Sequence, residues 1–144
     1  MRIERKVLNM MISTRGRYAL RVIIDLAEQN SEEYIPLKDI VERQNISQKY
    51  VEGIMTQLSK NNLVEAIHGK KGGYRLNKAP DEYTIGEILR VTEGSLAPVA
   101  CLDDGAKPCE RSEHCRTFPV WDKLNDMINN YLDSVTVADL MKTE

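Results

Sequence analysis

Residues 46–58 read Ile46-Ser47-Gln48-Lys49-Tyr50-Val51-Glu52-Gly53-Ile54-Met55-Thr56-Gln57-Leu58. Apolar residues recur in this stretch at the spacing of one helix face, and Ser47 precedes them as an N-cap. Just before it, Pro36 leads into a shorter apolar-patterned segment, residues 37–44, and Asn45-Ile46-Ser47 supplies a turn between the two. Two short helices joined by a tight turn predict a helix-turn-helix motif.

On either side of this motif the pattern predicts one more helix and a hairpin. Upstream, Ser13 or Thr14 is expected to cap a helix that runs to about Gln29. Downstream, residues 63–68 and 74–77 are predicted to be short strands, because the glycines of the intervening Gly69-Lys70-Lys71-Gly72-Gly73 permit the positive φ angles of a hairpin. Together these elements predict a winged helix, and Pro80 marks its C-terminal end.

The rest of the chain is predicted to be helical around one long loop. Thr84-Ile85-Gly86-Glu87 has the capping-box pattern of a helix that continues to Gly94, and Thr136 is expected to cap a last short helix. Residues 95–119 show no regular period, and such loops are usually functional or disordered. The next helix has an apolar face too broad for one small core, which favours a partner helix: Val120, Trp121, Leu124, Met127, Ile128, Tyr131 and Leu132.

The expected fold class is therefore mainly α with a small β-wing. We expect an N-terminal extension over residues 1–11 and a winged helix-turn-helix DNA-binding domain over residues 12–80. Residues 81–144 are expected to hold a cysteine sensor loop, residues 95–119, and the dimerisation helices.

Charge is distributed unevenly along the chain. Residues 1–80 contain 14 Lys and Arg against 9 acidic residues, whereas residues 81–144 contain 6 against 13. This favours a nucleic-acid-binding half beside a non-binding half, with two ordinary solvated surfaces as the alternative. No stretch approaches the roughly 20 apolar residues that span a bilayer, and residues 1–11 lack the apolar run of a secretory signal. We expect a cytoplasmic protein that does not contact membranes.

Enzyme chemistry is not expected. The chain has two histidines, His68 and His114, and it lacks a G-x-S-x-G motif, a phosphate-binding glycine loop and a C-x-x-C pair. A hydrolase or a redox enzyme needs a nucleophile with an oriented base, or a cofactor fingerprint.

A recognition helix keeps hydrogen-bonding side chains on its outer face for base edges in the major groove. The predicted DNA-contacting residues of the second helix are Ser47, Gln48, Lys49, Tyr50, Glu52 and Gln57, with Ser47 placed to meet a phosphate. In the hairpin, His68, Lys70 and Lys71 lie where a wing crosses the backbone or enters the minor groove. Phosphates repel Glu52, so this residue is expected to contribute selectivity rather than affinity, by accepting from a cytosine amino group. A plain surface glutamate is the alternative.

Three stretches together resemble the IscR, NsrR and CymR family of winged-helix regulators. They are Ile12-Ser13-Thr14-Arg15-Gly16-Arg17-Tyr18-Ala19-Leu20, then Ile46 to Glu52, and Gly69-Lys70-Lys71-Gly72-Gly73-Tyr74. The resemblance covers about residues 11–142. It implies a homodimer joined through the long C-terminal helix, which binds double-stranded operator DNA through Lys49, Tyr50, Glu52 and His68. Cluster-bearing members often have arginine where this chain has His68.

All three cysteines, Cys101, Cys109 and Cys115, lie in the loop over residues 95–119. Their odd number and the lack of an export signal disfavour a disulfide framework. Thiolates are natural ligands of iron-sulfur clusters and of zinc, although the spacing excludes a paired C-x-x-C zinc ribbon. A thiol redox switch without metal, a zinc site and an inert loop are the alternatives to an iron-sulfur cluster.

The resemblance favours a cluster of the 2Fe-2S type, because IscR-like and NsrR-like members have three cysteines in this loop and bind a cluster. IscR-like members use a histidine as the fourth ligand and NsrR-like members an aspartate. This chain has neither, because Phe118 stands at the position of the histidine and Arg17 at that of the aspartate. His114 is the candidate fourth ligand, with Glu113 next. The expected function is a DNA-binding regulator that senses iron-sulfur or redox status. The alternatives are a redox-switch repressor without metal and a CymR-like regulator of cysteine or sulfur metabolism, whose partner protein has no support in this sequence.

Overall fold

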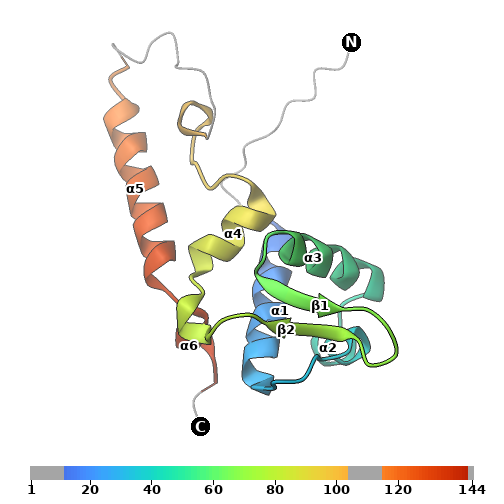
Figure 1. The fold of residues 1–144 in the computed structure, drawn as a ribbon. Coiled ribbons are helices and arrows are strands. Elements are labelled where there is room, and N and C mark those ends of the chain that lie inside the picture. Colours follow the sequence, from blue (N-terminus) through green and yellow to red (C-terminus); the bar gives the residue numbers. More distant parts are fainter. Residues whose placement is uncertain (1–11, 104–114, 143–144) are drawn as a thin grey trace, which may run out of the picture.

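The structure is a computed structural model, and it describes residues 12–103 and 115–142. Its elements are α1 (Thr14–Gln29), α2 (Leu37–Gln44), α3 (Gln48–Lys60), β1 (Val64–Ile67), β2 (Gly73–Leu76), the 3-10 turn η1 (Pro80–Glu82), α4 (Ile85–Glu93), the 3-10 turn η2 (Ala100–Leu102), α5 (Phe118–Ser134) and α6 (Val137–Leu140). Helices α1 to α3 and the hairpin form a head, α4 lies beside it, and α5 stands apart on the far side of α4 (Figure 1). The expected N-terminal extension lies outside the described residues.

The helix-turn-helix forms where its caps predict it. The Ser13 hydroxyl accepts a hydrogen bond from the Gly16 backbone nitrogen at 3.0 Å, and the Ser47 hydroxyl accepts from that of Tyr50 at 3.3 Å. Asn45 closes α2 in the left-handed conformation, with φ 53°, which asparagine tolerates better than most residues. Asn45 and Ser47 thus fix the turn that leads from α2 into α3.

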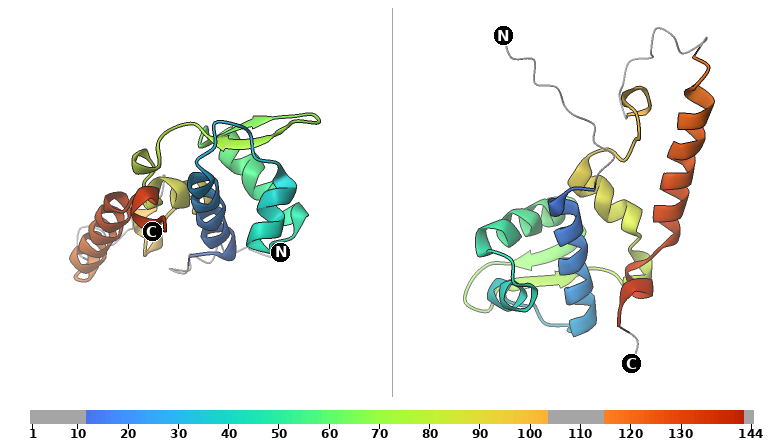
Figure 2. Two further views of the ribbon diagram at one scale, coloured as in Figure 1. Left: turned by 90° about the horizontal axis from the view of Figure 1, so that it is seen from below. Right: turned by 180° about the vertical axis from the view of Figure 1, so that it is seen from behind.

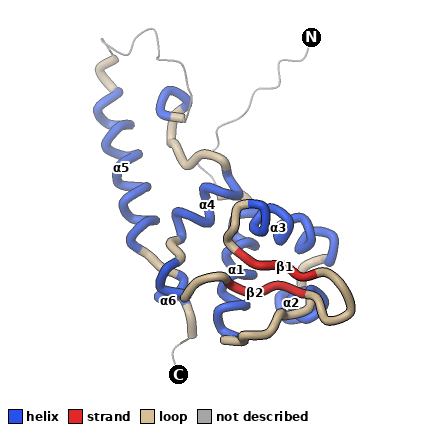
Figure 3. Tube along the Cα trace, in the orientation of Figure 1, coloured by secondary structure: helices blue, strands red, loops and turns tan. Residues whose placement is uncertain are grey.

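The two strands, red in Figure 3, form one hairpin. They pair antiparallel, with Val64 opposite Leu76. On the other side of β2, Ile35 and Tyr74 exchange two backbone hydrogen bonds of 2.8 and 2.9 Å. Gly73 permits this approach, because a Cβ at that position would collide with the Ile35 carbonyl. The hairpin is thereby fastened to the segment between α1 and α2.

One hydrophobic core joins the head to the last helix. Its largest fully buried side chains are Val22, Ile23, Ile40, Val51, Ile54, Met55, Leu58, Tyr83, Ile88 and Val137. The Tyr83 hydroxyl donates to the Leu63 carbonyl at 2.7 Å, and burial raises the pKa of Tyr83. Tyr83 and Val137 belong to this core, so the core contains residues from both sides of residue 80. The domain boundary predicted at that residue stays a prediction.

The predicted capping box of α4 forms only in half. The Thr84 hydroxyl accepts from the Glu87 backbone nitrogen at 3.1 Å, as predicted. The Glu87 carboxylate, however, lies 2.8 Å from Lys78 Nζ, and an ammonium is a stronger donor than a backbone amide. The box is complete at α6, where Thr136 and Asp139 each accept from the other's backbone nitrogen.

Helix α5 begins at Phe118, so the predicted irregular loop ends two residues early, because Pro119 is well suited to the first turn of a helix. The helix has no buried residue, and Val120, Met127 and Tyr131 are 59%, 59% and 68% exposed. Seen from behind, it is separated from α1 to α3 by α4 (Figure 2). Among the described residues, no helix has the length and apolarity to cross a membrane.

Candidate nucleic-acid interface

The N-terminal half of α3 presents polar side chains to solvent. Val51, Ile54, Met55 and Leu58 are completely buried, which fixes the rotation of the helix about its axis. The exposed residues are then Ser47, Gln48, Lys49, Tyr50 and Glu52. Five of the six residues predicted on this helix are therefore exposed to solvent.

Helix α1 adds two residues beside this surface that were not among the predicted contacts. The Tyr18 and Tyr50 rings meet edge to face, with centroids 5.5 Å apart. The Arg21 guanidinium lies 5.1 Å from the centre of the Tyr18 ring and donates to Gln44 on α2. The signal in the sequence for Arg21 was its position outside the apolar stripe of α1.

Glu52 lies on the recognition helix, close enough to the hairpin for its charge to act on Tyr74. Gln48 Nε2 donates to Glu52 Oε1 at 3.3 Å. Burial raises the pKa of Tyr74 on β2, and the negative charge of Glu52 raises it further. An ionised carboxylate has about four acceptor sites, so Glu52 keeps the capacity to accept a hydrogen bond from another molecule.

The hairpin turn carries the second group of predicted contacts. His68, Lys70 and Lys71 are exposed. Gly69 has φ 114°, a conformation that favours glycine, and its carbonyl accepts from the Gly72 backbone nitrogen at 3.0 Å. The turn therefore presents two lysines and a histidine to solvent.

Gln57 is directed into the protein. Its Nε2 donates to the Val91 carbonyl of α4 at 2.8 Å, and its Oε1 accepts from Arg15 Nε of α1 at 2.8 Å. Both ends of the amide are thus occupied inside the fold, because α4 packs against the C-terminal half of α3. Gln57 is therefore left out of the interface proposed below.

Two of the three cysteines lie in the described part of the chain. Cys101 is a half-buried thiol in η2, and Cys115 is half-buried with its Sγ 3.4 Å from Thr117 Oγ1. Cys109 and His114 lie outside the described residues. Within residues 12–103 and 115–142, no group of three or more His, Cys, Asp and Glu side chains is arranged to hold a metal ion.

The family of Rrf2, described as an iron-dependent transcriptional regulator, matches this chain over residues 12–143. The chain belongs to the Rrf2 family.

Relatives of this Rrf2 protein are transcription regulators. IscR of Erwinia tasmaniensis is 35% identical, over 94% of this chain and 81% of that protein. CymR of Bacillus subtilis is 39% identical, over 91% and 89% respectively. The chain is accordingly an Rrf2 transcription regulator of a DNA-binding family and not an enzyme, as predicted.

Solved structures confirm the predicted winged-helix fold. The structure of CymR, the global cysteine regulator of B. subtilis, has a TM-score of 0.71 at 38% identity, covering 90% of this chain and 95% of that one. The IscR structure from T. potens has a TM-score of 0.69 at 34% identity, covering 90% and 85%. IscR and CymR relatives resemble this Rrf2 protein to a similar degree, so similarity alone does not choose between them.

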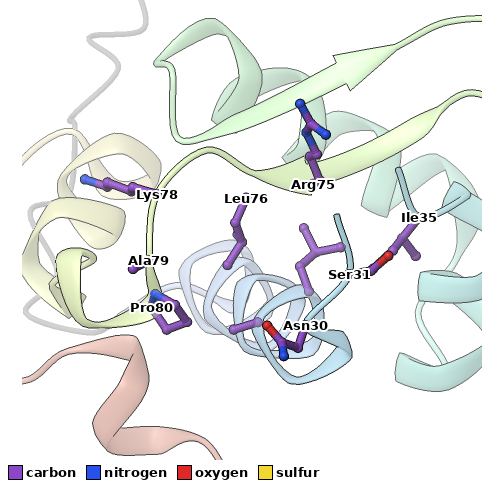
Figure 4. A pocket seen from close by; sticks show the side chains of 10 residues that line it. Asn30, Ser31, Ile35, Arg75, Leu76, Lys78, Ala79 and Pro80 are labelled. Atoms are coloured by element: carbon purple, nitrogen blue, oxygen red, sulfur yellow. The ribbon is translucent and has the colours of Figure 1, made fainter. Parts of the chain in front are cut away.

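One cavity of about 270 Å³ in this Rrf2 protein lies between the C-terminal end of α1 and β2 (Figure 4). Apolar residues such as Leu26 and Leu76 line it. Two cations also line it, but Arg75 is paired with Glu65 at 2.9 Å and Lys78 with Glu87 at 2.8 Å. These charges are neutralised within the protein, and we assign no ligand to the cavity.

Proposed function

We propose that this Rrf2 regulator binds palindromic operator DNA as a homodimer, with α3 in the major groove and the hairpin turn on the backbone or in the minor groove. The observation that carries the proposal is the exposure of polar side chains at the start of α3, a helix whose rotation about its axis is fixed by its buried apolar stripe. The proposed contacts are Ser47, Gln48, Lys49, Tyr50, Glu52, His68, Lys70 and Lys71.

The contacts divide by chemistry. Lys70 and Lys71 neutralise phosphates and release counterions, which gives affinity without sequence information. Ser47 lies at the N-terminus of α3, where its hydroxyl and the backbone N–H groups of the helix are placed to bind a phosphate together. Glu52 can only accept hydrogen bonds, so among base edges in the major groove it suits the amino group of cytosine or adenine and disfavours the acceptor-only edge of guanine.

Two substitutions separate affinity from selectivity. Lys71→Ala is expected to weaken binding to all duplexes by a similar factor. It should also lower the salt slope, the dependence of log affinity on log salt concentration, by about one. Glu52→Ala is expected to change the ranking of operator variants, since one good base contact discriminates by about 1–3 kcal/mol. The measurement is fluorescence anisotropy on a duplex selected from a random DNA pool, and on its single-base variants, at several salt concentrations.

The matched control is Lys60→Ala, which removes an exposed charge at the other end of α3 and should leave the salt slope closer to that of the parent protein. An unchanged ranking of duplexes with Glu52→Ala would refute the selectivity role. Binding that is independent of salt would refute the phosphate contacts.

We further propose that Cys101, Cys109 and Cys115 hold an iron-sulfur cluster of the 2Fe-2S type, with His114 as the fourth ligand. Support comes from the donor chemistry, because thiolates are the usual ligands of such clusters. Cys101 and Cys115 are both half-buried, which allows access together with partial protection. Resemblance to the cluster-bearing members of the family favours the same assignment. A bound cluster would supply sensitivity to iron supply and to oxidants.

Serine variants test the cluster. Protein purified without oxygen is expected to be coloured and to contain iron and sulfide, and serine at any of the three cysteines should bleach it and change its operator affinity. His114→Ala should weaken the absorption more than Glu113→Ala, which serves as its control. Visible spectra, iron and sulfide assays and duplex titrations are the measurements.

The alternatives predict different results. Colourless protein without iron would refute the cluster. If oxidation then changed operator affinity in the parent but not in the serine variants, a thiol switch without metal would explain the loop. The remaining alternative, a CymR-like regulator of cysteine metabolism, predicts that the triple serine variant binds every operator as the parent does.

A further inference from the structure

Helix α4 connects the recognition helix to α5, and both of its ends are fastened. At its N-terminal end, the Ile85 backbone nitrogen donates to the Val135 carbonyl at 2.9 Å, just after α5 ends. In the last turn of α4, Arg90 donates to Asp133 at 2.7 Å and to Asn129 at 2.8 Å, both on α5. The angle between α4 and α5 is thereby fixed by backbone and charged contacts together.

At the C-terminal end of α4, the link to α3 is Gln57. The Val91 carbonyl is one of the last four of its helix, which have no hydrogen-bond partner within the helix. Gln57 Nε2 supplies that partner at 2.8 Å. Within residues 12–103 and 115–142, this is the one hydrogen bond between α3 and α4.

Arg15 determines which way the Gln57 amide points. Arg15 Nε donates to Gln57 Oε1 at 2.8 Å, and Arg15 Nη2 donates to the Gly53 carbonyl of α3 at 3.1 Å. With its oxygen held by a guanidinium, the amide must turn its NH₂ group toward Val91. One side chain thus joins α1, α3 and α4.

Two glycines keep α4 close to its neighbours. A Cβ at Gly86 would collide with Asp133 of α5, and a Cβ at Gly16 of α1 would collide with the Glu93 carboxylate. The same carboxylate accepts hydrogen bonds from the backbone nitrogen and the hydroxyl of Ser13. Helix α4 therefore has little freedom to shift between the head and α5, and Gln57 completes its attachment to the recognition helix.

We propose that Gln57 is a positioning residue that sets the placement of α3 relative to α5, and so determines which half-site spacing the dimer accepts. This inference rests on the proposed function, with α5 as the dimer helix. In a symmetric dimer the distance between the two recognition helices fixes the spacing of operator half-sites. A looser junction between α3 and α4 lets each head adjust, which lowers the preference for one spacing.

Two variants of Gln57 separate its two contacts. Gln57→Met keeps nearly the same volume and removes both hydrogen bonds. Gln57→Glu keeps the acceptor for Arg15 but replaces the donor that faces the Val91 carbonyl with a second acceptor. Gln29→Met, at the exposed C-terminal end of α1, is the matched control.

The test compares a palindromic duplex, selected from a random DNA pool with the parent protein, with three derivatives. Two derivatives have one base pair inserted or removed at the centre, and the third keeps a single half-site. The parent and Gln29→Met should prefer the selected spacing by about tenfold or more, within the usual range of coupling between sites. Both Gln57 variants should prefer it by about threefold or less, with half-site affinity within about twofold of the parent.

A Gln57→Met protein that keeps the parent's spacing preference would overturn the inference. So would a Gln57→Glu protein that behaves as the parent, since the contact with Arg15 would then suffice. If Gln57→Met does not fold, as judged by its thermal unfolding, Gln57→Glu alone decides. Failure of the parent to select any palindrome would overturn the proposed function itself, and the spacing role with it.

Discussion

Met127→Asp is expected to convert the dimer to a monomer and to weaken binding to the selected palindrome about a hundredfold or more. The reason is that two linked heads bind two half-sites about 10²- to 10⁴-fold more tightly than one head binds one. Met127 is 59% exposed and lines a shallow apolar groove on α5 with Pro119, Val120, Lys123 and Leu124. Val120, Leu124, Met127 and Tyr131 recur at helical spacing along this face, as two α5 helices packed together require. A carboxylate buried in such an interface loses its hydration without a partner. Sedimentation velocity and duplex titration measure the two effects.

The control for this substitution is Asn130→Asp, which adds the same charge to an exposed residue outside that apolar row. It should sediment as the parent does and keep its affinity. If Met127→Asp also sedimented as the parent does, the face of α5 would not be the dimer interface, and the spacing role of Gln57 would lose its premise.

Asp25→Ala is expected to lower the free energy of unfolding by about 3 kcal/mol, toward the lower end of the range for breaking a buried ion pair. Asp25 is 4% exposed and accepts from Arg43 at 2.7 and 3.0 Å and from Gln44 at 2.8 Å. The same carboxylate raises the pKa of Arg43 through these hydrogen bonds. Without it, a guanidinium and an amide at the end of α2 lose their acceptor, although Arg43, at 36% exposure, regains part of its hydration.

Urea unfolding checks this expectation. Glu42→Ala removes an exposed carboxylate next to the same arginine and should change stability by about 0.5 kcal/mol or less. A loss below about 1 kcal/mol with Asp25→Ala would show that the pair contributes little, as the desolvation cost of ion pairs allows. Because Asp25 holds the residues just before the turn into α3, the variant should also bind operator DNA more weakly at temperatures where it remains folded.

Local features of the fold were predictable from the sequence because each depends on residues close together in the chain. Ser13, Ser47 and Thr84 cap helices through backbone groups three residues away, and the buried stripe of α3 needs only its own periodicity. The exposed start of α3 followed from that stripe. The wing followed from the glycines around Lys70 and Lys71.

Contacts between distant residues were not predictable in this way. Gln57 lies outside the apolar stripe of α3, and only the packing of α4, 34 residues further along, shows that its amide is occupied. Glu87 matched a capping box, but Lys78 competes for its carboxylate from the end of the wing. Tyr18 and Arg21 join the recognition surface because α1 crosses beside Tyr50, which a helical pattern does not encode.

The buried position of Val137 has a consequence for how the protein is made. Val137 is completely enclosed, and its backbone nitrogen donates to the Tyr83 carbonyl at 2.9 Å. Many N-terminal domains fold while the ribosome is still extending the chain. Here the head lacks one wall of its core until residue 137 has left the exit tunnel, by which time the whole of α5 has been synthesised. A nascent chain therefore does not present a finished recognition surface before the helix proposed to pair it with a second copy is in place.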